Sequence, residues 1–210
     1  MKILALTHGN AHEILSEAEA LIRAGEILIL PTDTVYGIVG SAKSERAIKK
    51  AFSVKNRPEE KAFPVFVESI PAARRIAHIS DVKARFLESV WPGPVTVVFE
   101  KKEILPVILT GMKNTIGIRI PDHPFLAKLL SLLDFSLFQT SANISSLPPA
   151  KTKEDVLRYY DESHQDIALF VDAGELSGVP STVIDYTGEH PIILRSGLVS
   201  KAELDRLLGL

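Results

Sequence analysis

The chain has 210 residues, with 24 Lys and Arg against 26 Asp and Glu, a formal net charge of −2 and 46% hydrophobic residues. A chain of this length makes one large domain, or one domain with an extension, and buries roughly 70% of its unfolded surface. The absence of cysteine excludes disulfides, zinc–thiolate and iron–sulfur sites, and a cysteine nucleophile. The near-neutral charge excludes a generally basic nucleic-acid coat, so any polyanion must be met by a local cluster.

Membrane and export signals are not expected in this sequence. No segment reaches the ~18 consecutive apolar residues of a membrane span. Residues 1–9 form too short an apolar run for a signal peptide, and an amphipathic stretch follows directly. We therefore expect a cytoplasmic location and no membrane partner.

The first half of the chain alternates predicted helices and strands. Apolar residues at helical spacing predict a helix that Asn10 and Glu13 open through a capping box. The apolar run at residues 26–30 then predicts a strand buried on both faces. Ser44 caps the next expected helix, and Pro64 favours the start of a strand or an edge position. The expected helices of this half are residues 10–24, 44–52, 71–77 and 81–91, and the expected strands are residues 26–30 and 63–67.

The second half is richer in strands. Asp122 as cap and Pro124 at the first helical position predict the start of an apolar helix, because that position needs no N–H. The expected helices are residues 124–133 and helices opened by Thr152 and Ser200, and the expected strands are residues 94–99, 115–120, 137–140, 167–171, 182–186 and 192–194. The late strands are too closely spaced for helical crossovers and must partly pair antiparallel. We predict an α/β fold, a single domain over residues 1–210 with an open mixed sheet flanked by helices.

Residues 31–37 carry hydroxyls, a carboxylate and a phenol directly after the buried strand at 26–30. Ligands collect at the carboxyl ends of strands in open α/β sheets, which favours a binding site here. A turn accounts for the same residues, because Thr and Asp favour turns and helix caps. On the residues alone, both interpretations stay open.

A basic stretch occupies residues 49–61. Lysine is a mobile point charge and arginine a planar fork, so Lys55, Arg57 and Lys61 can together hold a triphosphate. The alternative is a solvated helix end, where cations also interact well with the helix dipole. Since most charge runs are exposed, the residues alone favour the solvated end.

Two further polar features accompany predicted strands. Ser141 and Asn143 supply donors and acceptors that suit a neutral polar ligand, although either can cap a turn. Arg119 lies within an apolar strand beside Gly117, so its charge must be paired or must bind an anion. A carboxylate or phosphate ligand and an internal Asp or Glu partner are equal alternatives. Trp91 is interpreted as the anchor of a turn to the core.

Several well-known catalytic motifs are missing. The sequence has no G-x-x-x-x-G-K-[ST], G-x-G-x-x-G, H-E-x-x-H or G-x-S-x-G. Its six histidines show no spacing expected of a metal site, so we assign no metal ligand. No side chain is an obvious covalent nucleophile, and we expect catalysis by positioning and charge stabilisation.

Taken in chain order, these motifs resemble the YrdC family of threonylcarbamoyl-AMP synthases over roughly residues 11–198. The matching motifs are PTDTVYG at residues 31–37, Lys55-x-Arg57-Pro58, WPGP at residues 91–94, Arg119-x-Pro121-Asp122-His123-Pro124, Ser141-x-Asn143, Ser181-Thr182-Val183 and Leu194-Arg195-x-Gly197. The resemblance implies a twisted open sheet around a concave, positively lined cavity. It also implies the short form of the family, without the extra C-terminal domain of longer relatives.

The resemblance implies a nucleotidyltransferase that joins L-threonine, bicarbonate and ATP into threonylcarbamoyl-AMP and releases pyrophosphate. The product would pass to a tRNA threonylcarbamoyl transferase complex for threonylcarbamoyladenosine (t6A) modification of tRNA. Mg²⁺ is expected with ATP, bridging phosphate oxygens with few protein ligands. Direct contact with tRNA or double-stranded RNA stays open.

The resemblance also assigns residues to roles. It implies catalytic roles for Lys55, Arg57, Ser141 and Asn143. It implies ATP binding by Arg57, Lys61, Thr115, Asn143 and Arg195. It implies threonine binding by Thr34, Arg119, Ser141 and Ser181. Phe66 stands where the family sometimes has a histidine, which predicts a more apolar wall of the threonine pocket.

Two other functions are considered. The first is a double-stranded RNA-binding or regulatory paralogue of the same fold. Such relatives typically lose the Lys-x-Arg or the Ser-x-Asn pair, and this chain retains both. The second is a carbamoyl-transfer module of hydrogenase-maturation proteins, which lies in much longer chains with zinc-finger-like cysteines. The retained pairs and the absence of cysteine favour the synthase.

Overall fold

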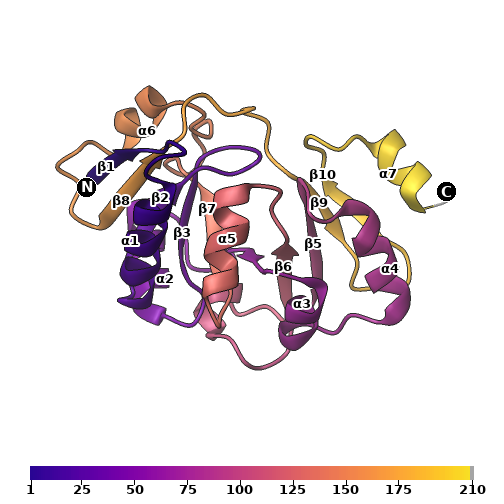
Figure 1. Cartoon of the computed structure of the whole chain (residues 1–210). Coiled ribbons are helices and arrows are strands. Elements are labelled where there is room, and N and C mark those ends of the chain that lie inside the picture. The colour runs from indigo at the N-terminus through magenta and orange to yellow at the C-terminus, as the bar shows by residue number, and fades with distance from the viewer. Residues whose placement is uncertain (209–210) are drawn as a thin grey trace.

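The computed structural model describes residues 1–208, except for the side chains of residues 205 and 208, and its strands form one ten-stranded sheet (Figure 1). In chain order the strands are β1 (Lys2–Ala5), β2 (Ile27–Leu30), β3 (Gly37–Ser41), β4 (Val65–Phe66), β5 (Val95–Glu100), β6 (Thr115–Arg119), β7 (Leu137–Ser141), β8 (Ile167–Asp172), β9 (Thr182–Asp185) and β10 (Ile192–Arg195). The helices are α1 (Ala11–Arg23), α2 (Glu45–Val54), α3 (Ile70–Ile76), α4 (Asp81–Val90), α5 (Pro124–Leu132), α6 (Lys153–Tyr159), α7 (Lys201–Leu208) and the 3-10 helix η1 (Val107–Thr110).

The sheet is mixed, with the order β1-β8-β2-β3-β7-β4-β6-β5-β9-β10. The pairs β1–β8, β2–β8, β4–β6 and β5–β9 are parallel. The pairs β2–β3, β3–β7, β4–β7, β5–β6 and β9–β10 are antiparallel. The late strands β9 and β10 pair antiparallel because their short connection cannot cross the sheet. The predicted open mixed sheet is therefore confirmed.

Two strands lie outside the sequence-based prediction. β1 forms one edge of the sheet beside β8. β3 contains Gly37 and Gly40, which lower the strand propensity of its sequence. The glycine at position 40 is needed for packing, since an added Cβ would lie 2.8 Å from the ring of Phe138 on β7. Gly40 thus lowers the strand propensity of this segment and also permits its close approach to the neighbouring strand.

Three of the predicted caps are confirmed and two are wrong. The Ser200 hydroxyl accepts from the amide of Glu203 at the start of α7. The Ser44 hydroxyl caps α2, and Thr152 takes part in a full capping box at α6. Asn10 makes no side-chain cap on α1, because its amide bonds to the backbone of the preceding residues instead. At α5 the N-cap residue is His123 rather than Asp122, and its side chain makes no capping bond.

Two hydrophobic clusters pack on opposite faces of the sheet. One joins α1 and α5 to β2, β3, β7 and β8, and the other joins α2, α3 and α4 to the reverse face. On β5, Val95 and Val97 belong to the second cluster, so Thr96 and Val98 point to the face that carries α1 and α5. Those two helices lie away from β5 and β9 (Figure 1). This part of the face is left for a cavity.

A segment between β8 and β9, residues 173–181, crosses from one half of the sheet to the other along the top of the view in Figure 1. We call it the β8–β9 strap. The Tyr36 hydroxyl bonds to its backbone near the start, and the Ser177 hydroxyl donates to the carbonyl of Thr34 at 2.8 Å. The strap is thereby tied to the polar loop that follows β2.

None of the helices in the described residues is both long enough and apolar enough to span a membrane.

Candidate active site

A cavity of about 310 Å³ opens on the uncovered face, over β5, β6, β7 and β9. Its floor includes Gly117, where an added Cβ would lie 3.1 Å from Pro64 and 3.3 Å from Thr96. Glycine therefore keeps the floor open. Six of the residues predicted from the sequence line this cavity: Thr34, Arg57, Arg119, Ser141, Ser181 and Arg195. Three arginines and no carboxylate stand among its lining residues, so the cavity attracts anions.

The other four predicted residues lie outside the cavity lining. Lys55 and Asn143 are buried behind it, and Lys61 is exposed to solvent. Thr115 begins β6 and shares a strand face with Gly117, two residues further along. The structure thus brings six predicted residues to one cavity and places two of the others in direct support of it.

Lys55 is 1% exposed and is surrounded by oxygen atoms. Its Nζ donates to the carbonyls of Ser141 at 2.5 Å and Asn143 at 2.8 Å, and to Asn143 Oδ1 at 2.8 Å. Three acceptors require the ammonium form, because a neutral amine has only two N–H donors. Burial disfavours that form and, with the charge of Arg57, lowers the pKa of Lys55 to about 7.

The Ser141 hydroxyl donates to Asn143 Oδ1 at 2.6 Å, and the amide nitrogen of Asn143 donates to the carbonyl of Leu147 at 2.5 Å. These bonds orient the amide so that its oxygen faces Lys55. The predicted catalytic residues Lys55, Ser141 and Asn143 consequently form one hydrogen-bonded unit at the end of β7. Solvation of a helix end does not describe this lysine, although the sequence alone favoured that interpretation.

Arg57 extends from the chain after α2 toward the cavity. Its guanidinium donates to the carbonyls of Lys61 and Ala62, each at 3.0 Å, and lies 5.3 Å from the centre of the Phe63 ring. Burial lowers the pKa of Arg57. Two backbone carbonyls and a ring therefore hold this cation in place while its outer face remains at the cavity.

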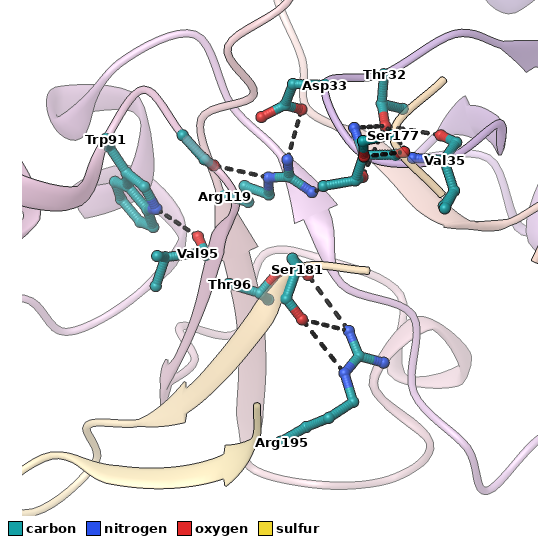
Figure 2. Close-up of polar contacts among 12 residues, drawn as sticks. Thr32, Asp33, Val35, Trp91, Val95, Thr96, Arg119, Ser177, Ser181 and Arg195 are labelled. Carbon is teal, nitrogen blue, oxygen red and sulfur yellow. Dashed lines mark hydrogen bonds and ion pairs between the residues drawn. The ribbon is translucent and has the colours of Figure 1, made fainter. Parts of the chain in front are cut away.

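Arg119 is 2% exposed, and of the two alternatives that the sequence left open the structure shows the internal carboxylate partner. Its Nη2 donates to Asp33 at 2.5 Å and its Nε donates to the carbonyl of Gly93 at 2.8 Å (Figure 2). Nη1 lies 3.4 Å from the Thr34 hydroxyl. Burial lowers the pKa of Arg119, and the Asp33 carboxylate opposes that effect. Two of the five N–H donors remain for a ligand at the cavity.

Phe66 does not form the apolar pocket wall that the sequence predicts. It is fully buried, and the Arg119 guanidinium lies 5.7 Å from its ring centre. Phe66 is not among the residues that line the cavity. It supports the arginine from the core, because β4 and β6 pair in parallel with Phe66 beside Arg119.

Ser181 and Arg195 meet at the cavity beside Thr96, below Arg119 in the view of Figure 2. Arg195 Nη2 donates to the carbonyl of Ser181 at 2.8 Å and reaches its hydroxyl at 3.3 Å. Burial lowers the pKa of Arg195. The Ser181 hydroxyl also lies 3.0 Å from Thr96 Oγ1.

Asp33 and Thr96 were not predicted as site residues. Asp33 lies within the polar run at residues 31–37, and a single buried arginine in an apolar strand is a signal that one nearby carboxylate pairs with it. Thr96 carries a weaker signal, since it alternates with Val95 and Val97 along one strand. Trp91 anchors its turn as predicted, because its indole N–H donates to the carbonyl of Val95 at 2.7 Å.

The mixed sheet with helices on both faces makes this an α/β protein, and three arginines line a cavity on one face of its sheet. The chain belongs to the Sua5/YciO/YrdC family, whose model, described as "Telomere recombination", matches residues 20–197. The family and fold class expected from the motifs are thus confirmed.

Named relatives extend this comparison. A threonylcarbamoyl-AMP synthase of Pyrococcus abyssi is 34% identical over 91% of this chain and 56% of the relative. A putative threonylcarbamoyl-AMP synthase of Methanocaldococcus jannaschii is 30% identical over 98% of this chain and 96% of the relative. The structure of P. abyssi Sua5 complexed with L-threonine matches with a TM-score of 0.90 at 31% identity, over 99% of this chain and 60% of that one. This chain spans 56% of the length of two curated relatives that it matches, those of P. abyssi and Bacillus subtilis.

Proposed function

We propose that this chain is an L-threonylcarbamoyladenylate synthase, a nucleotidyltransferase that uses L-threonine, bicarbonate and ATP. The observation that carries the proposal is the cavity itself. Arg119 presents two unused N–H donors there, and Arg57 and Arg195 stand at the same cavity without a lining carboxylate. The complex of the P. abyssi relative with L-threonine supports threonine as a substrate.

The side of the cavity formed by Arg119, Thr34 and Ser181 suits the threonine carboxylate, because a guanidinium fork binds such a group with two hydrogen bonds. Ser141 completes this threonine side. Arg57 and Arg195 hold the phosphates of ATP. We propose that Lys61 at the rim, Thr115 and Asn143 extend the ATP site beyond the cavity.

In the proposed reaction the threonine amine forms a C–N bond to the bicarbonate carbon, and water leaves. An oxygen of the resulting carbamate then forms a bond to the α-phosphorus of ATP, and the bond from that phosphorus to the bridging oxygen of pyrophosphate breaks. Arg57, and Lys55 in its ammonium form, favour the departure of pyrophosphate, since they place positive charge where negative charge develops. The unit of Lys55, Ser141 and Asn143 orients the reacting groups.

The donor set of the cavity does not fit a protein-bound metal. Among the side chains that the structure describes, no cluster of three or more His, Asp or Glu residues could bind an ion, and no carboxylate lines the cavity. The Mg²⁺ that we expect to accompany ATP would be held by phosphate oxygens and water.

We propose that the product serves a tRNA threonylcarbamoyl transferase, that the enzyme works in the cytoplasm and that residues 1–210 act as one domain. An RNA-binding paralogue is not favoured, because the hydrogen-bonded unit around Lys55 is complete.

Pyrophosphate release tests the proposal. The purified chain is incubated with ATP, bicarbonate and L-threonine, and parallel reactions omit one substrate each. We expect release that falls sharply when threonine or bicarbonate is left out. Equal release without threonine would overturn the assignment.

A further inference from the structure

Thr96 lies at the cavity with its hydroxyl aimed at Ser181. The two hydroxyl oxygens are 3.0 Å apart, and Thr96 is 3% exposed. Neither the motifs nor the relatives assign a role to this threonine. Which of the two hydroxyls donates is important, because it decides whether Ser181 can donate a hydrogen bond to a ligand or accept one.

The hydrogen-bond capacity of Ser181 decides the direction. A serine hydroxyl has one proton and accepts two hydrogen bonds. Arg195 can only donate, so its Nη2 at 3.3 Å takes one acceptor position of the Ser181 oxygen. Thr96 Oγ1 has no other hydrogen-bond partner among the described residues. If Ser181 donated to Thr96, the Thr96 proton would be a buried donor without an acceptor, which is unfavourable.

The favoured arrangement therefore has Thr96 donating to Ser181. Both acceptor positions of the Ser181 oxygen are then filled, by Thr96 and Arg195. Its own proton is the only hydrogen-bonding capacity left for the cavity. Ser181 in this state binds an acceptor atom, such as a carboxylate oxygen, and rejects an ammonium group.

The backbone fixes this geometry from both sides. β5 and β9 pair in parallel, with Thr96 opposite Val183, and the amide of Thr182 donates to the carbonyl of Pro94 at 2.9 Å. The indole of Trp91 holds the carbonyl of the residue before Thr96 (Figure 2). The backbones that carry the two hydroxyls are thereby fixed relative to each other.

We propose that Thr96 is a positioning residue. By donating to Ser181, it leaves the Ser181 hydroxyl able only to donate a hydrogen bond, and this bond goes to the threonine carboxylate. The inference rests on the proposed function and deepens it, since it names the polarity of one contact at the threonine side. Thr96 touches no reacting atom in this account and acts only through Ser181.

A double-mutant cycle tests the inference, with Thr96→Val, Ser181→Ala and the double variant compared by pyrophosphate release. Valine keeps the shape of threonine and removes its hydroxyl. We expect Thr96→Val to raise the threonine KM about tenfold in the parent and less than twofold in the Ser181→Ala background, because the lost effect runs through one hydrogen bond. The ATP KM should change less than twofold in every variant. An equal effect of Thr96→Val in both backgrounds would overturn the inference.

Thr96→Ser is the matched control, because it restores the hydroxyl without the methyl group. We expect its threonine KM within twofold of the parent, and a defect equal to that of Thr96→Val would also overturn the inference. Equilibrium dialysis of labelled L-threonine repeats the cycle without turnover. If the parent bound threonine but released no pyrophosphate, the proposed function would fail, while the dialysis cycle would still decide the role of Thr96.

Discussion

Arg119 illustrates why an arginine rather than a lysine is needed at the proposed threonine side. Asp33 and the Gly93 carbonyl each take one N–H and hold the planar group in place. The remaining donors lie in the same plane, which matches a carboxylate. A lysine ammonium would satisfy Asp33 and would have no rigid fork left for a ligand.

Arg119→Lys tests this reasoning, since it keeps the charge and removes the fork. We expect the threonine KM to rise at least about 30-fold, as for the loss of a charged, paired hydrogen bond in a buried site, with the ATP KM nearly unchanged. Arg75→Lys is the matched control, because Arg75 is exposed and pairs with Glu68 away from the cavity. Steady-state kinetics of pyrophosphate release measures both. An unchanged threonine KM in Arg119→Lys would place threonine elsewhere.

The lowered pKa of Lys55 predicts how the free energy of unfolding changes with pH. Its pKa is lowered from 10.5 to about 7, so between these values the unfolded chain binds a proton that the folded chain does not. Stability therefore rises with pH across this window, by up to about 1.4 kcal/mol per pH unit, and this contribution is lost as the pH falls through 7.

The variant Lys55→Met should lack that slope. Urea unfolding between pH 7 and 9 compares the slope of unfolding free energy with pH, so an overall loss of stability in the variant does not matter. Lys49→Met is the matched control, because Lys49 is an exposed lysine on the same helix α2. Parallel slopes in the parent and Lys55→Met would show that Lys55 stays charged throughout.

Single residues also show which parts of the site could be predicted from the sequence. Arg119 and Ser141 were identifiable because a charge in an apolar strand and a polar group after a strand both need an explanation. Thr96 was not, because a threonine is an ordinary strand residue and only the pairing of β5 with β9 brings it to Ser181. Phe66 was misplaced for the same reason, since strand register decides which face a side chain takes.

At the scale of elements, the β8–β9 strap connects two parts of the cavity lining. It begins after β8, contacts the backbone of Thr34 and ends at Ser181. Its start is held by the Tyr36 hydroxyl, which donates to the Gly174 carbonyl at 2.7 Å and accepts from the Ala173 amide at 2.9 Å. The Tyr36 phenol and the Ser177 hydroxyl together thus fix the strap that joins the surroundings of Thr34 to Ser181.

Tyr36→Phe removes that attachment and leaves two backbone groups without a partner. We expect a loss of about 2 kcal/mol in unfolding free energy, together with a higher threonine KM. Tyr159→Phe loses one exposed hydrogen bond, to the Pro148 carbonyl, and should cost about 0.5 kcal/mol or less. Denaturant unfolding compares the two. Equal losses would mean that the strap is held by its other contacts.

Elements differed in how well their sequence indicated them. α1 and α2 were predicted because their apolar residues repeat at helical spacing, and β2 because it is apolar throughout. β3 was not predicted because Gly37 and Gly40 lower its strand propensity, and the packing of Gly40 against Phe138 on β7 is not visible in the sequence. The order of strands in the sheet is a long-range property that local patterns do not contain.

At the scale of the whole molecule, a net charge of −2 coexists with a cavity that three arginines line. Positive charge is thus concentrated in one concave place, of a size typical of small-molecule sites. This distribution predicts little attraction for a nucleic-acid duplex. In an electrophoretic assay with double-stranded RNA at 0.15 M salt, we expect no shift at roughly 1 µM protein. A shift under these conditions would favour the RNA-binding paralogue.

In the proposed reaction, one cavity joins threonine, the bicarbonate carbon and the adenylate of ATP. The most direct measurement follows ¹⁴C from labelled bicarbonate into an adenylate, separated by chromatography and identified by mass spectrometry. We predict that label enters the adenylate only with ATP and L-threonine both present, and that Arg119→Lys reduces the yield at low threonine. Pyrophosphate release without labelled adenylate, or labelling that does not need threonine, would contradict the account.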